Sequence, residues 1–414
     1  MQIKSAPDDF VVEEIVRLPV QRSGAYTIYR LQKRGITTLQ AQAGLAALFG
    51  VPLSAVSFPA LKDKMALAVQ YGTVRGSGLA EAEGPGFRAE RVGMSARPLS
   101  PRDLLGNRFT VVLRDLTAEQ AASIPERLAC LQRFGFPNYF DEQRFGSYAP
   151  GQEWVGKRIL LRDAEGALRA HLAEPFAGDP PQVQVFKAHA QQHWGEWDRL
   201  LHEAPKPSNF RSVLTFLVDH PQDYRKALNL VTPRVLSLYL AAYSSLLWNR
   251  LAARYLSDVL RENSVYLDKA VQVAGELLPF YEELPTACLE QLKAVQVPLF
   301  HHRMATADSR MAAICEAILA EEGIRREDLK ARLLHKAYLP RGSRALLVFP
   351  AETSVGEMGL DELAKTRYKR TISFVLPPGS YATLMLKILV QGAPLVAGAD
   401  QLSAVKQEDA GNEM

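Results

Sequence analysis

The segment "FGFPNYFDEQRFGSYAP", residues Phe134–Pro150, has the most unusual composition in the chain. Aromatic residues stand here among glycines and prolines, together with Asn138, Gln143 and Arg144, and they follow neither a helical nor a strand period. A pocket for an extruded nucleobase requires such groups: an aromatic face for stacking, an amide for the base edge and a cation for phosphate. An aromatic loop that closes one end of a hydrophobic core has the same composition, so the segment alone leaves both interpretations open.

A second short segment raises a similar question. In "PALKDKMALAVQY", residues Pro59–Tyr71, Asp63 stands between Lys62 and Lys64, just ahead of a run with strand-like alternation. A charged triplet between apolar segments is usually a solvated turn. The alternative is a carboxylate held at a site by flanking positive charge.

The composition of the whole chain limits the class of protein and its partners. The 414 residues are 47% hydrophobic and 23% charged, typical of a globular protein of two or three domains. The net charge of +4 is compatible with a nucleic-acid partner without indicating one. The three cysteines lie far apart and predict neither disulfides nor a metal site. No apolar run approaches the roughly 18 residues of a membrane span, and the N-terminal segment lacks the apolar core of a signal peptide, so a cytoplasmic protein without a membrane partner is expected.

The pattern along the chain predicts one domain interrupted by another. Up to about residue 151, strands such as 9–16, 25–34, 66–74 and 106–116 alternate with helices at 37–50 and 118–135, with Thr38 as a candidate cap and Gly50 at a helix end. The segment from about 154 to 340 is dominated by helical periodicity. Strands return after Pro340, followed by a helix near 380–390, and the polar tail from about Ala397 is expected to be disordered.

A pair of histidines and a basic stretch are further candidate sites. His189 and His193 are spaced to share a metal, but no third ligand is near in sequence, so surface histidines are expected and no metal is predicted. In the basic stretch 325–344, the helical periodicity that begins at Ser309 is expected to continue as far as Leu339. Its residues Arg325, Arg332 and Lys336 would then share one face, which suits RNA phosphates or is simply a solvated surface.

Six segments in chain order resemble the TruD family of tRNA pseudouridine synthases. The family's catalytic motif, Lys-Asp-(Lys/Arg)-x-Ala-x-Thr-x-Gln, is similar to "KDKMALAVQ", and its Pro-Asn-Tyr-Phe-Gly-x-Gln-Arg-Phe-Gly element is similar to "PNYFDEQRFG". The other four are "IKSAPDDFVVEE", "GNRFTVVLRD", "YLAAYSSLLWN" and "FVLPPGSYAT". The chain departs from the pattern at Asp141, at Ala68 and at "VPLFHHRM", residues 297–304, where the family has a Pro-(Leu/Gly)-x-Gly element. The last departure leaves the RNA contacts of this region open.

The resemblance implies a role for each matched residue. Asp63 would be the catalytic aspartate, ionised beside Lys4, which is a better direct partner than Lys62 or Lys64. Phe140 would stack on the extruded uracil, and Asn138 would bond near the aspartate or the base edge. Plausible phosphate contacts are Lys64, Arg144, Arg341 and Arg344. Glu14 and Gln70 would support the site from behind, and Lys62 is interpreted as solvated.

The resemblance also implies the architecture and the reaction. The fold would be α+β, a pseudouridine-synthase catalytic domain with a mixed, mainly antiparallel sheet, formed by residues 1–152 and 340–400. A mainly helical TRUD insertion, 153–339, would face it across a basic cleft, and 401–414 would be a flexible tail. The expected activity is cofactor-free isomerisation of uridine in tRNA at position 13 by a monomer. Another RNA site, or a non-catalytic RNA-binding protein of the same fold, remains an alternative.

Overall fold

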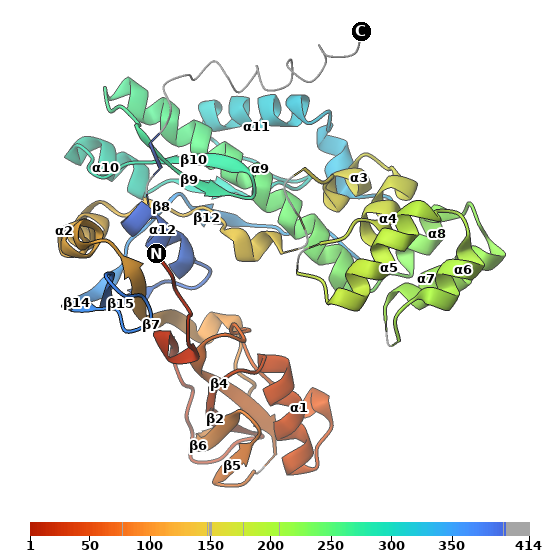
Figure 1. Ribbon diagram of the computed structural model, residues 1–414, viewed down its shortest axis with the longest axis horizontal. Helices are drawn as coiled ribbons and strands as arrows, with labels where there is room; N and C mark the ends of the chain where they lie inside the picture. The colour runs from red at the N-terminus through yellow and green to blue at the C-terminus, as the bar shows by residue number, and fades with distance from the viewer. Residues whose placement is uncertain are drawn as a thin grey trace. The chain divides into compact units, whose positions relative to one another are not determined.

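The computed structural model of the protein describes residues 1–76, 78–146, 148, 151–176, 178–206, 208–391 and 393–394. The chain forms two compact units (Figure 1). Unit 1 consists of residues 1–136 and 348–390, and unit 2 consists of 137–347 together with the described residues after 390. The polar tail expected to be disordered lies outside the described residues. None of the described helices is long and apolar enough to span a membrane.

Unit 1 is built on a mixed sheet whose strand order is β14-β15-β7-β1-β4-β2-β6-β5, with β3 paired to β4. Its strands are β1 (Phe10–Val16), β2 (Tyr26–Lys33), β3 (Val56–Ser57), β4 (Leu67–Arg75), β5 (Glu81–Gly84), β6 (Phe87–Ser95), β7 (Leu104–Leu116), β14 (Ala351–Leu360) and β15 (Tyr368–Leu376). The β1–β4 pair is parallel, and the other pairs are antiparallel. The predicted α+β class with a mainly antiparallel sheet is confirmed.

The helices of unit 1 pack on this sheet. They are η1 (Pro7–Asp9), α1 (Thr38–Phe49), η2 (Leu53–Ala55), η3 (Pro101–Asp103), α2 (Ala118–Phe134) and α12 (Ala382–Gln391). Leu45 of α1 is buried in one apolar cluster with Leu31 of β2 and Phe87 of β6. The cap of α1 is Thr37, not Thr38 as expected, because the Thr37 hydroxyl accepts a bond from the amide of Gln40 and the Gln40 side chain bonds back.

Unit 2 is mainly helical and is organised around α9 (Pro233–Glu262), with α11 (Ser309–Glu321), β9 (Lys269–Val273) and β10 (Glu276–Phe280) beside it (Figure 1). A group of shorter helices precedes α9: η4 (Glu142–Phe145), α3 (Val155–Leu160), α4 (Ala164–Ala173), α5 (Pro181–Gln192), α6 (Trp197–Glu203), α7 (Phe210–Asp219) and α8 (Tyr224–Asn229). The remaining elements are α10 (Thr286–Lys293), β11 (Gln296–Pro298), η5 (Arg326–Lys330), β12 (Ser343–Ala345) and β16 (Ala393–Pro394). The short strands β8 (Phe136–Pro137) and β13 (Leu347–Val348) lie where the chain passes from one unit to the other.

The predicted basic helix after residue 325 is wrong. Helix α11 ends at Glu321, and Gly323 follows with a φ of 66°. The Asp328 carboxylate then accepts bonds from the backbone amide and the guanidinium of Arg325, which closes the short turn η5. These local bonds end the helical period, so Arg325, Arg332 and Lys336 do not share a helix face.

Candidate functional site

In unit 1 the structure brings Asp63 and Lys4 together. The Lys4 ammonium donates to Asp63 Oδ2, and the amide of Met65 donates to Oδ1 over 3.0 Å. The Asp63 side chain retains 33% of its exposure, whereas that of Lys4 retains 15%. The predicted ion pair is therefore present, with its carboxylate still accessible to a ligand.

The N-terminal segment is fixed on both sides of Lys4 by one buried arginine. Gln2 and Arg114 of β7 exchange two backbone hydrogen bonds of 2.9 Å. The Arg114 guanidinium also makes two bonds, of 2.9 and 3.0 Å, to Asp9, and one of 2.9 Å to Asp361. Lys4 itself has a φ of 63°, so the chain bulges between the two anchors. Its ammonium lies 4.6 Å from the centre of the Phe10 ring.

A second lysine supports the aspartate from inside the domain. Lys33, the last residue of β2, is 1% exposed, and its ammonium donates to the main-chain carbonyl of Asp63 at 2.5 Å and to that of Ile36 at 2.9 Å. Burial lowers the pKa of Lys33 to about 8, an effect strengthened by Lys62 and opposed by the charge of Asp63. Lys33 could not be predicted from the sequence, because a lysine at the end of an alternating strand is indistinguishable there from a solvated one.

The surroundings of Asp63 favour its ionised form. Burial acts to raise the pKa of the Asp63 carboxyl group, but the hydrogen bonds from Lys4 and Met65 and the charges of Lys4 and Lys33 outweigh it. The net effect is a pKa below the ordinary value of an aspartate. The group is thus an anion throughout the neutral range.

A buried layer lies directly behind the Lys62–Lys64 turn. The Lys62 ammonium lies 2.7 Å from Glu14 Oε1, with side chains 9% and 0% exposed, so the interpretation of Lys62 as solvated is wrong. Glu14 Oε2 also accepts the amide of Tyr71 at 2.8 Å. The Thr38 hydroxyl donates to Gln70 Oε1 at 3.1 Å and accepts the amide of Lys62 at 2.9 Å. Glu14 and Gln70 thus anchor the turn, whereas Lys64 is exposed.

In unit 2 a separate group forms around Asn138 and Phe140. Arg344 donates from Nε to the Asn138 carbonyl at 2.7 Å and from Nη2 to Asn138 Oδ1 at 2.5 Å. Its guanidinium lies 4.4 Å from the centre of the Phe140 ring, and the ring meets Trp248 edge-on at 5.4 Å. Arg344, expected to contact phosphate, is thus bonded to Asn138 and packed on Phe140.

Helix α9 fixes this group through two side chains. Asn249, 1% exposed, accepts the Phe140 amide at 2.8 Å and donates to the Phe140 carbonyl at 2.9 Å. Ser245, one turn earlier, accepts a 2.9 Å bond from Arg144 Nε, and the Arg144 guanidinium lies 5.4 Å from the Phe140 ring. Both anchors belong to the segment "YLAAYSSLLWN", whose role the sequence alone did not reveal.

The aromatic rings of the segment between Phe134 and Phe145 are buried. Phe134, Phe136, Tyr139, Phe140 and Phe145 are each 8% exposed or less. Core packing is therefore a real function of these rings. Phe140 differs from the others because two guanidinium groups lie over its ring and its peptide is clamped by an asparagine.

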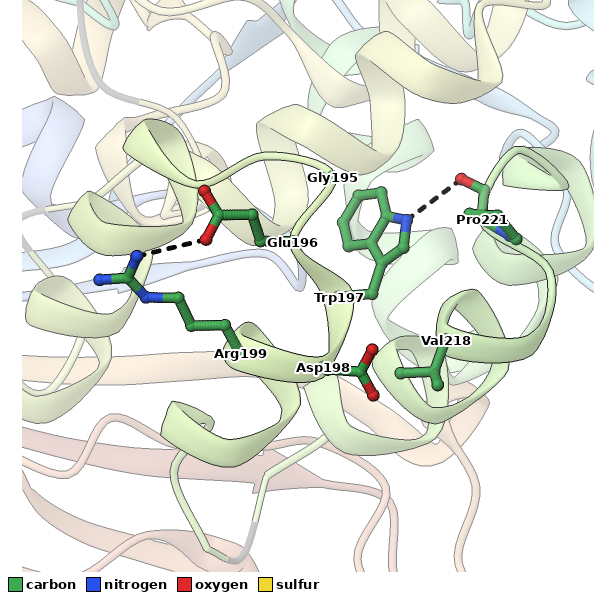
Figure 2. Close-up of a pocket in the computed structure, with 7 residues that line it drawn as sticks. All are labelled: Gly195, Glu196, Trp197, Asp198, Arg199, Val218 and Pro221. Atoms are coloured by element: carbon green, nitrogen blue, oxygen red, sulfur yellow. Dashed lines mark hydrogen bonds and ion pairs between the residues drawn. The ribbon is translucent and has the colours of Figure 1, made fainter.

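A pocket of about 370 Å³ lies elsewhere in unit 2 and contains none of the predicted site residues. Figure 2 shows two contacts among the residues that line it: Arg199 is turned toward Glu196, and the indole of Trp197 donates to the Pro221 carbonyl at 3.2 Å. His189 and His193 lie next to the carboxylates of Glu203 and Glu196, at 3.4 and 3.0 Å. Within the described residues no group of three or more His, Cys, Asp and Glu side chains is arranged to hold a metal.

Comparison with known proteins places the chain in a family. Residues 1–389 match the family model of tRNA pseudouridine synthase D (TruD). The chain is 32% identical to the "Probable tRNA pseudouridine synthase D 2" of Methanocaldococcus jannaschii, over 94% of this chain and 91% of that protein. It is 27% identical to the "tRNA pseudouridine synthase D" of Aquifex aeolicus, over 94% and 98% of the two chains. A crystal structure from Methanosarcina mazei, described as that of the "Putative tRNA pseudouridine synthase D (TruD)", has the same fold, with a TM-score of 0.69, 24% identity and coverage of 94% and 93%. The chain is a member of the TruD family of tRNA pseudouridine synthases.

Proposed function

We propose that the protein isomerises uridine to pseudouridine in tRNA and that Asp63 is the reacting carboxylate. The observation that carries this proposal is the ionised, accessible Asp63 paired with Lys4 in a chain of the TruD family. In the reaction the N1–C1′ bond breaks, the base turns, a C5–C1′ bond forms, and a proton leaves C5 while N1 gains one. The atoms balance without an oxidant or reductant, so we propose a cofactor-free reaction.

Each step assigns a task to residues already described. An anionic carboxylate next to the sugar or the uracil ring acts as nucleophile or base, and Lys4 keeps it anionic at neutral pH. The detached base must stay enclosed while it turns, and Phe140 provides an aromatic face for it, with the Asn138 amide as a partner for the base edge. Arg344 and Asn249 support this assignment, because they hold Asn138 and Phe140 in one arrangement. Lys64, Arg144 and Arg341 are proposed to contact RNA phosphates.

The finer assignments are also proposals. Residues 1–152 and 340–400 would form the catalytic domain and 153–339 the TRUD insertion, acting as a monomer in the cytoplasm on position 13 of tRNA. Another RNA site is the alternative, and so is RNA binding without catalysis. The carboxylate argues against binding alone, because an anion weakens the binding of polyanionic RNA and is required only for the chemistry.

The test is primer extension on carbodiimide-treated tRNA after incubation with the wild type or with Asp63→Asn. The wild type is expected to give one new stop at a uridine, and the variant none, while both bind the tRNA. A stop of equal yield in the variant would remove Asp63 from the mechanism. Binding by the wild type without a stop in any tRNA would favour the non-catalytic alternative.

A further inference from the structure

The segment that departs from the family pattern, "FHHRM" at Phe300–Met304, belongs to a group of cationic side chains in unit 2. We call His301, His302, Arg303, Lys330 and Arg341 the basic cluster. The backbone brings them together. The amide of Leu299 donates to the Gly342 carbonyl at 2.9 Å, which places Arg341 beside the loop, and Arg326 Nη1 donates to the Met304 carbonyl at 3.2 Å, which holds η5 and its last residue Lys330 on the same loop.

Among the described residues, the cations of the basic cluster have no acidic partners. Arg303, Lys330 and Arg341 are exposed, and none of them forms an ion pair with any carboxylate in the part of the chain that the structure describes. Their neighbours Arg325 and Arg326 are paired with Asp328 and Glu316, at 3.1 and 2.8 Å. Within the described ranges, the charges of Arg325 and Arg326 are thus compensated, whereas those of Arg303, Lys330 and Arg341 are not. Uncompensated, exposed cations on one surface are suited to a polyanion.

Burial and the positive charges of the basic cluster lower the pKa of both histidines. Their ring centres are 6.3 Å apart, and both rings are half-buried. Burial lowers the pKa of His301, and His302, Arg341 and Arg303 lower it further. Burial and the charges of Arg303, Arg341 and Lys330 do the same for the pKa of His302. These charges are all positive, and a phosphate placed among them would oppose their effect on the pKa of the two rings.

We propose that the basic cluster contacts phosphate groups of the RNA substrate and that His301 and His302 take up protons when the RNA binds. This inference rests on the proposed function, because it takes tRNA as the ligand. It assigns RNA contact to the segment where this chain departs from its family pattern. The phosphates neutralise Arg303, Lys330 and Arg341, which removes the repulsion that adds to burial in keeping the two rings neutral.

The experiment measures the dissociation constant of the full-length protein for unmodified tRNA between pH 5.5 and 8 at fixed salt. For each proton taken up on binding, the affinity is expected to fall by up to about tenfold for each unit by which the pH rises through the titration range of the histidine. The variant His301→Gln/His302→Gln is expected to lose most of this pH dependence. The matched control, His189→Gln/His193→Gln, removes two histidines that lie beside carboxylates and is expected to keep it.

A second readout tests the phosphate contacts themselves. Replacing Arg303 and Arg341 by glutamine is expected to reduce the slope of log affinity against log salt by about one for each residue. An affinity of the wild type that does not change with pH would overturn the proton uptake, and an unchanged salt slope would overturn the phosphate contact. Both results are compatible with pseudouridine formation by the wild type. If the wild type forms no pseudouridine, that result counts against the proposed function and not against the RNA contact of the basic cluster.

Discussion

Asn249→Ala is the substitution whose effect follows most directly from the geometry. The Asn249 side chain satisfies both backbone groups of Phe140, which are buried. Alanine removes the partners that Asn249 provides for this N–H and C=O, at about 1–3 kcal/mol each, so we expect a loss of about 2–6 kcal/mol in the free energy of unfolding. Urea unfolding followed by fluorescence measures this loss.

The same substitution also releases the Phe140 ring from its fixed position. If stacking on the uracil contributes about 1–3 kcal/mol, its loss slows the reaction roughly 5- to 150-fold. The assay is single-turnover pseudouridine formation with enzyme in excess over tRNA, at a temperature where the variant is fully folded. Under these conditions product release and reduced stability do not affect the rate.

Asn229→Ala is the matched control. Asn229 lies in the same unit, and its side chain donates to the carbonyls of Arg225 and Leu333 and accepts the amide of His335, at 2.8–3.0 Å. Its replacement is expected to destabilise the protein and leave the single-turnover rate intact. A wild-type rate in Asn249→Ala, or an equal loss of rate in Asn229→Ala, would refute the reasoning.

Two further predictions concern unit 1. Lys4→Met removes the hydrogen bond and the charge that lower the pKa of Asp63, so the acid limb of the rate–pH profile is expected to move to higher pH. The lowered pKa of Asp63 stabilises the folded protein above the ordinary pKa of an aspartate, and this contribution is lost as the pH falls through the lowered value. In Lys4→Met the contribution is expected to disappear. Lys64→Met, which replaces an exposed neighbour of Asp63, is the control and is expected to leave the acid limb in place. An acid limb that does not move in Lys4→Met would contradict the role of Lys4 in lowering the pKa of Asp63. Arg114→Met leaves Asp9 and Asp361 buried without their partner and is expected to cost about 3–5 kcal/mol. Arg108→Met, which breaks an exposed pair with Glu352 on the same sheet, is expected to cost under about 1 kcal/mol. Equal losses of unfolding free energy in the two arginine variants would show that the buried network is not what stabilises the N-terminal segment.

The strands and long helices could be predicted because their residues agree locally with the final structure. The alternation in 10–16 matches the alternating burial of β1, and the apolar patterns of 106–116 and 233–262 match β7 and α9, where parts of the buried stretch are continuous. The helix expected after residue 325 does not form, because local signals compete with the helical period there. Gly323 adopts a positive φ after α11, and the Asp328 side chain closes a separate short turn.

The candidate site could be predicted only in part. Motif order identified Asp63 and Lys4, and the structure pairs them. The buried states of Lys33 and Lys62 could not be predicted, since each depends on a tertiary contact, with the Asp63 carbonyl and with Glu14. The bonds from Asn249 to Phe140 join residues 109 positions apart, which no local pattern encodes.

The order of the strands in unit 1 has a consequence for synthesis on the ribosome. The central strand β7 pairs with β15 along one edge, but β15 follows the whole of residues 137–347 in the chain. At roughly 5–20 residues per second, the ribosome needs about 13–50 s to translate residues 117–367, which separate β7 from β15. During this time the long edge of β7 has no native partner and is open to pairing with another nascent chain. A chaperone that covers this edge would therefore raise the yield of folded protein more than one that acts after release.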